Sequence, residues 1–275
     1  MAEISASEVS KLRKTTGAGM MDCKKALTES NGDFEKAIEI IRKKGQAVAN
    51  KRADREASEG VVLAKTNAAA TIGYMIALNC ETDFVAKNAD FVKLANNIID
   101  TAIAANCKDI ETLKAQKIGG KTIDELIVEQ IGVIGEKIEL AFFHKIESAQ
   151  VIPYIHYGSK LATLVGLSVA VNIEVGKDVA MQIAAMSPVA IDKDDVPAEV
   201  IAKEKEIGRE LAIKEGKPEN MLDKIAEGKV NKFFKENTLL NQEFTKDSKL
   251  TVRQYLQSAN KDLTVTSFKR YSLAG

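Results

Sequence analysis

The sequence is poor in the residues that most often carry chemistry: its 275 residues include no tryptophan, two histidines and three cysteines. Cys23, Cys80 and Cys107 are odd in number and have no CxxC spacing, so they predict neither a disulfide framework nor a zinc cage. No motif links His144 or His156 to a nucleophile. From these shortages we expect no metal site, no cofactor and no enzymatic activity.

Net charge and long apolar runs are also missing. Thirty-nine basic residues balance thirty-nine acidic ones, so the molecule has no net field that would draw it to nucleic acid or anionic lipid. No stretch reaches the roughly 18 to 20 apolar residues that a membrane span requires. The opening segment MAEISASEVSKLRK lacks the apolar core of a secretory signal. We therefore expect a cytoplasmic protein that binds neither nucleic acid nor membrane.

The first 45 residues predict three short helices. Ser5 and Glu8 have the spacing of a capping box, which favours a helix start, and the glycines of residues 17–19 favour a break. The third apolar stripe ends at Gly45. The polar segment 46–60 then favours a linker helix, because it is helix-prone and holds one bulky apolar residue.

Strand-like and helical segments alternate in the middle of the chain. The runs VVLAK and TIGYMIALNC flank a small-residue turn and predict a hairpin, and a helix is expected over 88–106. A similar order recurs with a strand over 161–172 followed by a helix over 178–186, which indicates two related halves. Gly119 and Gly120 lack the spacing of a phosphate-binding loop and predict a turn.

Two helices that each begin with a proline, 197–215 and 218–235, predict a helical hairpin. Because most of their other positions are charged, we expect a narrow apolar seam and an arm that projects from the body. The expected seam consists of Val200, Ile207 and Leu211 against Leu222, Ile225 and Phe233.

These patterns together predict an α+β fold in which a sheet and its covering helices form the core. The expected parts are an N-terminal helical module at 1–46, a linker helix at 47–60, one core half at 61–147, a second core half at 148–196 and 237–275, and the arm at 197–236.

The segment Cys80 to Asn88, with the sequence CETDFVAKN, lies where a strand is expected to end and a helix to begin. Such a junction can present side chains to a partner. A structural interpretation also fits, in which Thr82 or Asp83 caps the helix and Phe84 packs into the core beneath it. The residues alone leave both interpretations open.

TDFVAKN, the opening KLRKTTGAGMMDCKKAL and the later segment GKPENMLDKIAEGKVNKF are similar to the signatures of the bacterial elongation factor Ts family. The similarity runs from residue 3 to about residue 255. It implies an N-terminal domain of the ubiquitin-associated type, a two-part core and an antiparallel coiled-coil arm. It also implies a guanine nucleotide exchange factor for elongation factor Tu, without covalent chemistry of its own.

In that family the loop that matches Thr82, Asp83, Phe84 and Val85 enters the partner beside its magnesium and phosphate site. The resemblance implies that Phe84 acts as a wedge and that Asp83 competes for donors near the metal. Partners would be elongation factor Tu with GDP and without nucleotide, while a homodimer or a two-plus-two complex with it stays open. Further contacts are implied for residues in other segments: Leu12, Arg13, Ile138, His156 and Gly158.

A second function remains open at this stage. The three-helix module and the arm could bridge other proteins as a non-catalytic adaptor, with the TDFV segment serving only as a helix cap. The two functions differ in one observable, because only the exchange factor accelerates GDP release from elongation factor Tu.

Overall fold

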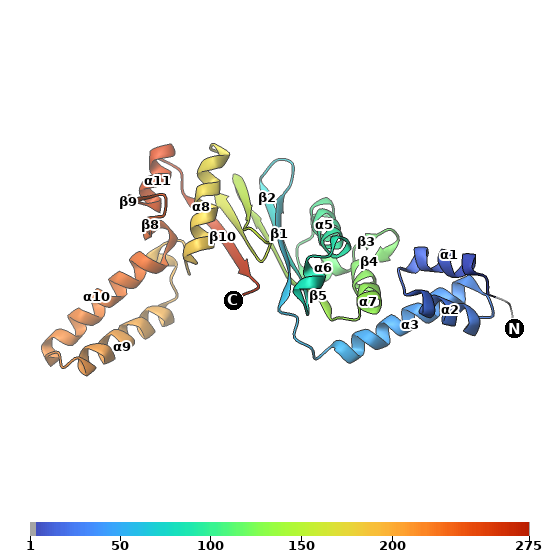
Figure 1. The fold of residues 1–275 in the computed structure, drawn as a ribbon. Helices are drawn as coiled ribbons and strands as arrows, with labels where there is room; N and C mark the ends of the chain where they lie inside the picture. The colour runs from blue at the N-terminus through green and yellow to red at the C-terminus, as the bar shows by residue number, and fades with distance from the viewer. Residues whose placement is uncertain (1–3, 275) are drawn as a thin grey trace. The chain divides into compact units, whose positions relative to one another are not determined.

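The structure is a computed structural model that describes residues 4–274. Helices and small sheets alternate along the chain, as expected for an α+β fold (Figure 1). The chain divides into two compact units. Unit 1 holds the described residues of Met1–Leu63, Met75–His144 and Ser272–Gly275, and unit 2 holds Ala64–Tyr74 and Lys145–Tyr271. Residues 1–3 of the predicted N-terminal module and residue 275 of the predicted second core half lie outside the described part.

Unit 1 begins with the three predicted helices, α1 (Ala6–Thr16), α2 (Met20–Glu29) and α3 (Phe34–Arg52). The capping box of Ser5 and Glu8 is present at the start of α1, and Gly17 ends this helix in the left-handed conformation. The Asp33 carboxylate accepts the Lys36 N–H and caps α3. The three helices share a small core of buried residues: Val9, Leu12, Ala18, Cys23, Ala26, Leu27 and Ala37.

Helix α3 corrects the prediction that the third helix ends at Gly45 and that a separate linker helix follows. The helix runs on through Gly45 to Arg52, and residues 53–58 are not helical. Gly45 is buried against α7 (Ile123–Ile134), where a Cβ built on Gly132 would lie 2.7 Å from the Cα of Gly45. The glycine therefore serves as a close helix–helix contact and not as a helix end.

The first sheet has the strand order β1-β2-β5, with β1 at Glu59–Thr66, β2 at Ile72–Cys80 and β5 at Ile138–Glu147. The first two strands form the predicted hairpin, and the Asn67 side chain accepts N–H groups of Thr71 and Ile72 in its turn. Gly119 and Gly120 form the predicted turn, both with positive φ. The remaining elements of this region are α4 (Asp83–Ala86), α5 (Ala89–Ala104), α6 (Ile110–Lys114), β3 (Lys117–Ile118) and β4 (Lys121–Thr122).

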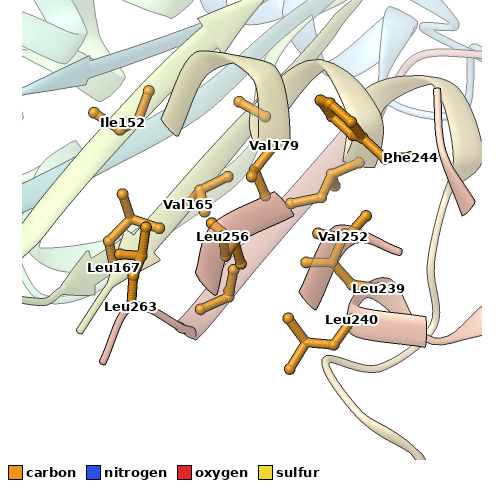
Figure 2. Packing of buried hydrophobic residues seen from close by; sticks show 13 residues of the cluster. Ile152, Val165, Leu167, Val179, Leu239, Leu240, Phe244, Val252, Leu256 and Leu263 are labelled. Carbon is orange, nitrogen blue, oxygen red and sulfur yellow. The ribbon is translucent and has the colours of Figure 1, made fainter. Parts of the chain in front are cut away.

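Unit 2 is built on the sheet β10-β7-β6, with β6 at Gln150–Ile155, β7 at Leu161–Leu167 and β10 at Val265–Ser272. The strand predicted to reach residue 172 ends at Leu167, and residues 168–172 connect it to α8 (Ile173–Met186). Figure 2 shows apolar side chains of β6, β7, α8 and α11 (Val252–Ala259) gathered in one cluster. The order of a hairpin followed by a helix, seen first with β1, β2 and α5, thus recurs with β6, β7 and α8. Short elements complete the unit: the 3-10 helices η1 (Lys193–Asp195) and η2 (Leu239–Asn241) and the strands β8 (Glu243–Phe244) and β9 (Asp247–Thr251).

The two helices that follow the prolines are α9 (Ala198–Lys214) and α10 (Glu219–Asn237). They pack against each other, and Arg209 forms an ion pair with Asp223 across the pair. Their seam agrees with the predicted one at Leu222, which is buried, but differs at Ile207 and Leu211, which are 40% and 39% exposed. Small residues bring the helices close together at the seam and leave the larger apolar residues of α9 on its flanks. The buried residues of the pair are Gly208, Ala212, Leu222, Ala226 and Val230.

Candidate functional site

The TDFV segment forms helix α4 between the end of β2 and the start of α5. The Thr82 hydroxyl accepts the Val85 N–H at 3.4 Å and caps α4. The Asn88 side chain accepts the Asp90 N–H at 2.8 Å and caps α5. Each cap is formed by a residue directly before its helix, so the four residues of α4 form a short helical turn directly after the sheet. The predicted capping role of Thr82 is confirmed.

Phe84 lies on the outside of this short helix. Its side chain is 83% exposed, whereas Ala86, two residues later, is buried. The structural interpretation in which Phe84 packs into the core is therefore wrong. An aromatic ring that stands in solvent leaves a large apolar area uncovered, and exposed aromatic groups of this kind are typical anchors of protein interfaces.

Asp83 already has a partner in this structure. Its carboxylate accepts a hydrogen bond from Lys87 Nζ at 2.6 Å, one helical turn further on. This hydrogen bond and the negative charge of Asp83 raise the pKa of Lys87 above its ordinary value. Both side chains are well exposed, so the pair is open to solvent and exchanges easily with other charged groups.

Two carboxylates tie the TDFV segment to the residues that precede β5. Glu136 accepts the Thr82 N–H at 3.1 Å and the Thr82 hydroxyl at 2.8 Å. In return, Glu81 accepts the Lys137 N–H at 2.6 Å. Arg52, the last residue of α3, donates to Glu81 at 3.0 Å. Sequence reasoning missed these roles of Arg52, Glu81 and Glu136, since nothing in their local pattern shows which distant residues they meet.

Cys80 lies at the base of the segment, fully buried. Its thiol donates to the Thr82 carbonyl at 3.2 Å. Burial, and after it the negative charge of Glu136, raise the pKa of Cys80 to about 12. At neutral pH the group is therefore a thiol, which is a poor nucleophile.

The other implied contact residues differ in exposure. Arg13 is exposed on α1, and His156 and Gly158 are exposed in the turn between β6 and β7. In that turn His156 Nδ1 lies 2.9 Å from the Tyr154 hydroxyl, and Gly158 has a φ of 84°.

Leu12 and Ile138 are 0% and 2% exposed. Leu12 belongs to the core of the three N-terminal helices, and Ile138 is the first residue of β5. Their side chains pack inside the protein in this structure, and the partner contacts expected from them stay predictions. Sequence resemblance could not separate the two cases, since a family signature records core residues as well as surface residues.

Among residues 4–274, no group of three or more histidine, cysteine, aspartate and glutamate side chains is placed to hold a metal ion. No helix in the same range is long and apolar enough to cross a membrane.

An α+β scaffold that holds an aromatic side chain outward on a capped and hydrogen-bonded loop is typical of a protein that recognises another protein. The family model described as elongation factor TS matches residues 81–275. Elongation factor Ts of Porphyromonas gingivalis is 54% identical, with 98% of each chain covered. That of Amoebophilus asiaticus is 55% identical over 97% of this chain and 98% of its own. That of Christiangramia forsetii is 53% identical over 99% and 100%. The chain belongs to the elongation factor Ts family.

Proposed function

We propose that the chain is a guanine nucleotide exchange factor for elongation factor Tu in translation elongation, and that α4 performs the exchange. Family membership over almost the whole chain supports the exchange role. The observation that carries the proposal for α4 is the exposure of Phe84, 83%, on a loop that is otherwise capped and hydrogen-bonded. Thr82 and Val85 are joined by the cap hydrogen bond of the same short helix.

Insertion of the Phe84 ring between two helices of the partner displaces the structure that holds magnesium and phosphate. The Asp83 carboxylate leaves Lys87 and competes for hydrogen-bond donors near the metal. Loss of magnesium leaves the negative charge of the diphosphate poorly compensated, so GDP leaves faster. No covalent bond is made or broken, and the factor binds both the GDP form and the nucleotide-free form of its partner.

Reciprocity sets the energy that this mechanism needs. A factor that weakens GDP binding to elongation factor Tu must have its own binding weakened by GDP to the same degree. A roughly thousandfold effect requires about 4 kcal/mol of differential binding, which a few well-placed anchors can supply.

The remaining parts of the molecule have supporting roles in this proposal. Helices α1 to α3 act as a domain of the ubiquitin-associated type, and the α9–α10 pair acts as a projecting coiled-coil arm. Arg13, His156 and Gly158 supply further contacts with the partner, and the complex works in the cytoplasm. Light scattering of the protein alone and with elongation factor Tu distinguishes a one-plus-one complex from a homodimer or a two-plus-two complex.

The test is the release of fluorescent GDP from elongation factor Tu, with the intact protein and with the double variant Asp83→Ala, Phe84→Ala. We expect the intact protein to accelerate release and the double variant to lose most of the effect while it stays folded. A matched control is Ile173→Ala, which removes an apolar side chain that is 50% exposed on α8. Chelation of magnesium should shrink the advantage of the intact protein, because the ion is then already absent.

Unchanged GDP release with the intact protein would contradict the exchange function. Binding to other proteins without any effect on GDP release is the result expected of an adaptor instead.

A further inference from the structure

Glu136 and Glu81 lie in two chain segments that exchange hydrogen bonds in both directions. Glu136 accepts from the backbone and side chain of Thr82, and Glu81 accepts from the backbone of Lys137. The partners are 54 and 56 residues apart in sequence, and both segments adjoin the neighbouring strands β2 and β5. We name this set of three hydrogen bonds the carboxylate clamp.

The clamp determines how Thr82 caps α4. The Thr82 hydroxyl donates its hydrogen to Glu136, so its oxygen lone pairs remain available for the Val85 N–H. The donor and acceptor roles of one hydroxyl are thus assigned by a residue outside the loop. Because α4 has only four residues, its first turn depends heavily on this cap.

Phe84 belongs to the same helical turn, α4. Its ring is exposed, so contacts with the protein's own core contribute little to its direction. The direction of the ring therefore depends on the backbone of α4, and this backbone depends on the clamp. Charge-assisted hydrogen bonds to a carboxylate are about twice as strong as neutral ones, which suits a contact that must keep a short loop ordered.

We propose that Glu136 is a positioning residue for GDP release, acting through Thr82 to hold Phe84 in its binding-competent direction. The inference rests on the proposed exchange function. The clamp raises the fraction of free molecules in which Phe84 already has the direction needed for binding. When this fraction falls, the apparent affinity for the partner falls in proportion. Once the complex is saturated the partner itself orders the loop, so the maximal rate of GDP release is retained.

The experiment measures the rate of GDP release against the concentration of the factor, with Glu136→Ala and Glu136→Gln. We expect Glu136→Ala to raise the half-saturating concentration about tenfold, equivalent to about 1.4 kcal/mol, with the maximal rate unchanged. Glu136→Gln keeps one acceptor oxygen in place of two, so it can accept either the Thr82 N–H or the Thr82 hydroxyl but not both. It should therefore rescue the value in part, to within about threefold of the intact protein. The matched control is Glu147→Ala, at the other end of β5, whose carboxylate pairs with Lys145.

Amide hydrogen exchange gives a second readout that does not depend on the partner. The Thr82 amide should be protected in the intact protein and exchange faster in Glu136→Ala, with the core of α5 unchanged. If Glu136→Ala does not fold, Thr82→Val removes the hydroxyl from the other side of the same contact and should raise the half-saturating concentration in the same way.

Three results overturn the inference: an unchanged half-saturating concentration in Glu136→Ala, a fall in its maximal rate alone, or equal Thr82 protection in the intact protein and in Glu136→Ala. Failure of the intact protein to accelerate GDP release is a separate result. It removes the exchange function, while the hydrogen-exchange comparison still decides whether Glu136 orders the loop.

Discussion

Phe84→Ala is the sharpest single perturbation of the proposed site. The ring is 83% exposed, so its removal leaves no cavity in the protein's own core. Surface substitutions of this kind change the free energy of unfolding by at most about 0.5 kcal/mol. Any large loss of exchange in this variant therefore reports a contact with the partner and not a loss of folding.

The magnitude follows from the area that the ring can bury. A phenylalanine side chain contributes roughly 200 Å² when it is fully enclosed. At 83% exposure, about 170 Å² remains for a partner to cover, which corresponds to about 4 kcal/mol at ~25 cal/mol per Å². Binding recovers only part of such a figure, because ordering and desolvation oppose it. We expect a loss of about 2 to 4 kcal/mol, or roughly 30- to 1000-fold.

The assay is stopped-flow release of fluorescent GDP from elongation factor Tu under limiting concentrations of the factor. The rate should fall in the order intact protein, Phe84→Leu, Phe84→Ala, since leucine keeps part of the apolar area but not the rigid ring. Thermal unfolding of each variant, measured in parallel, should coincide with that of the intact protein.

Two outcomes refute this reasoning. Full exchange activity of Phe84→Ala means that the ring is not an anchor. Destabilisation by more than about 1 kcal/mol means that the ring is packed inside the molecule, in conflict with its exposure.

Two further predictions concern stability. Gly132→Ala places a methyl group 2.7 Å from the Cα of Gly45, and the resulting shift of α3 should cost about 1 to 3 kcal/mol in denaturant unfolding. Gly228→Ala, in the interior of α10 with open space around it, should instead stabilise the protein by about 0.5 to 1 kcal/mol. Burial alone would raise the pKa of Asp192, but hydrogen bonds from Arg253, Asn241 and the Lys193 N–H outweigh it and lower the pKa. As pH falls, the Asp192 carboxylate therefore takes up a proton first in the unfolded state, where its pKa is about 3.9. The stabilisation that Asp192 contributes to the folded state is complete above that pH and is lost as pH falls through its lower pKa in the folded state. The intact protein should therefore be more stable than Asp192→Asn by about 1 kcal/mol at pH 7, a low figure because Arg253 is partly exposed. This difference in the free energy of unfolding should vanish near about pH 2. A difference that stays constant from about pH 7 to about pH 2 contradicts the assignment.

Local features of the fold could be predicted from the residues that form them. The capping box at Ser5, the turn at Gly119 and Gly120, and the cap at Thr82 each involve residues within a few positions of one another. The hairpin of β1 and β2 and the pair α9–α10 were likewise predictable, since their connections are short and their turn residues are distinctive.

The errors fall where a residue meets a distant partner. Gly45 was expected to end a helix, but Gly132, which is far away in sequence, gives it a packing role within α3. Of the large apolar residues assigned to the seam between α9 and α10, Leu222 is buried as predicted. Ile207 and Leu211 are not, because the buried positions of α9 are the small residues Gly208 and Ala212.

By itself the sequence determined the class of fold, the places where most helices and strands begin, and the family, because these depend on short-range patterns and on matching residues. Only the tertiary structure decided that Phe84 stands in solvent and that Glu136 accepts hydrogen bonds from Thr82. The physical reason is that exposure and hydrogen bonding depend on which segments meet in space. Here two strands bring together residues that are 54 positions apart.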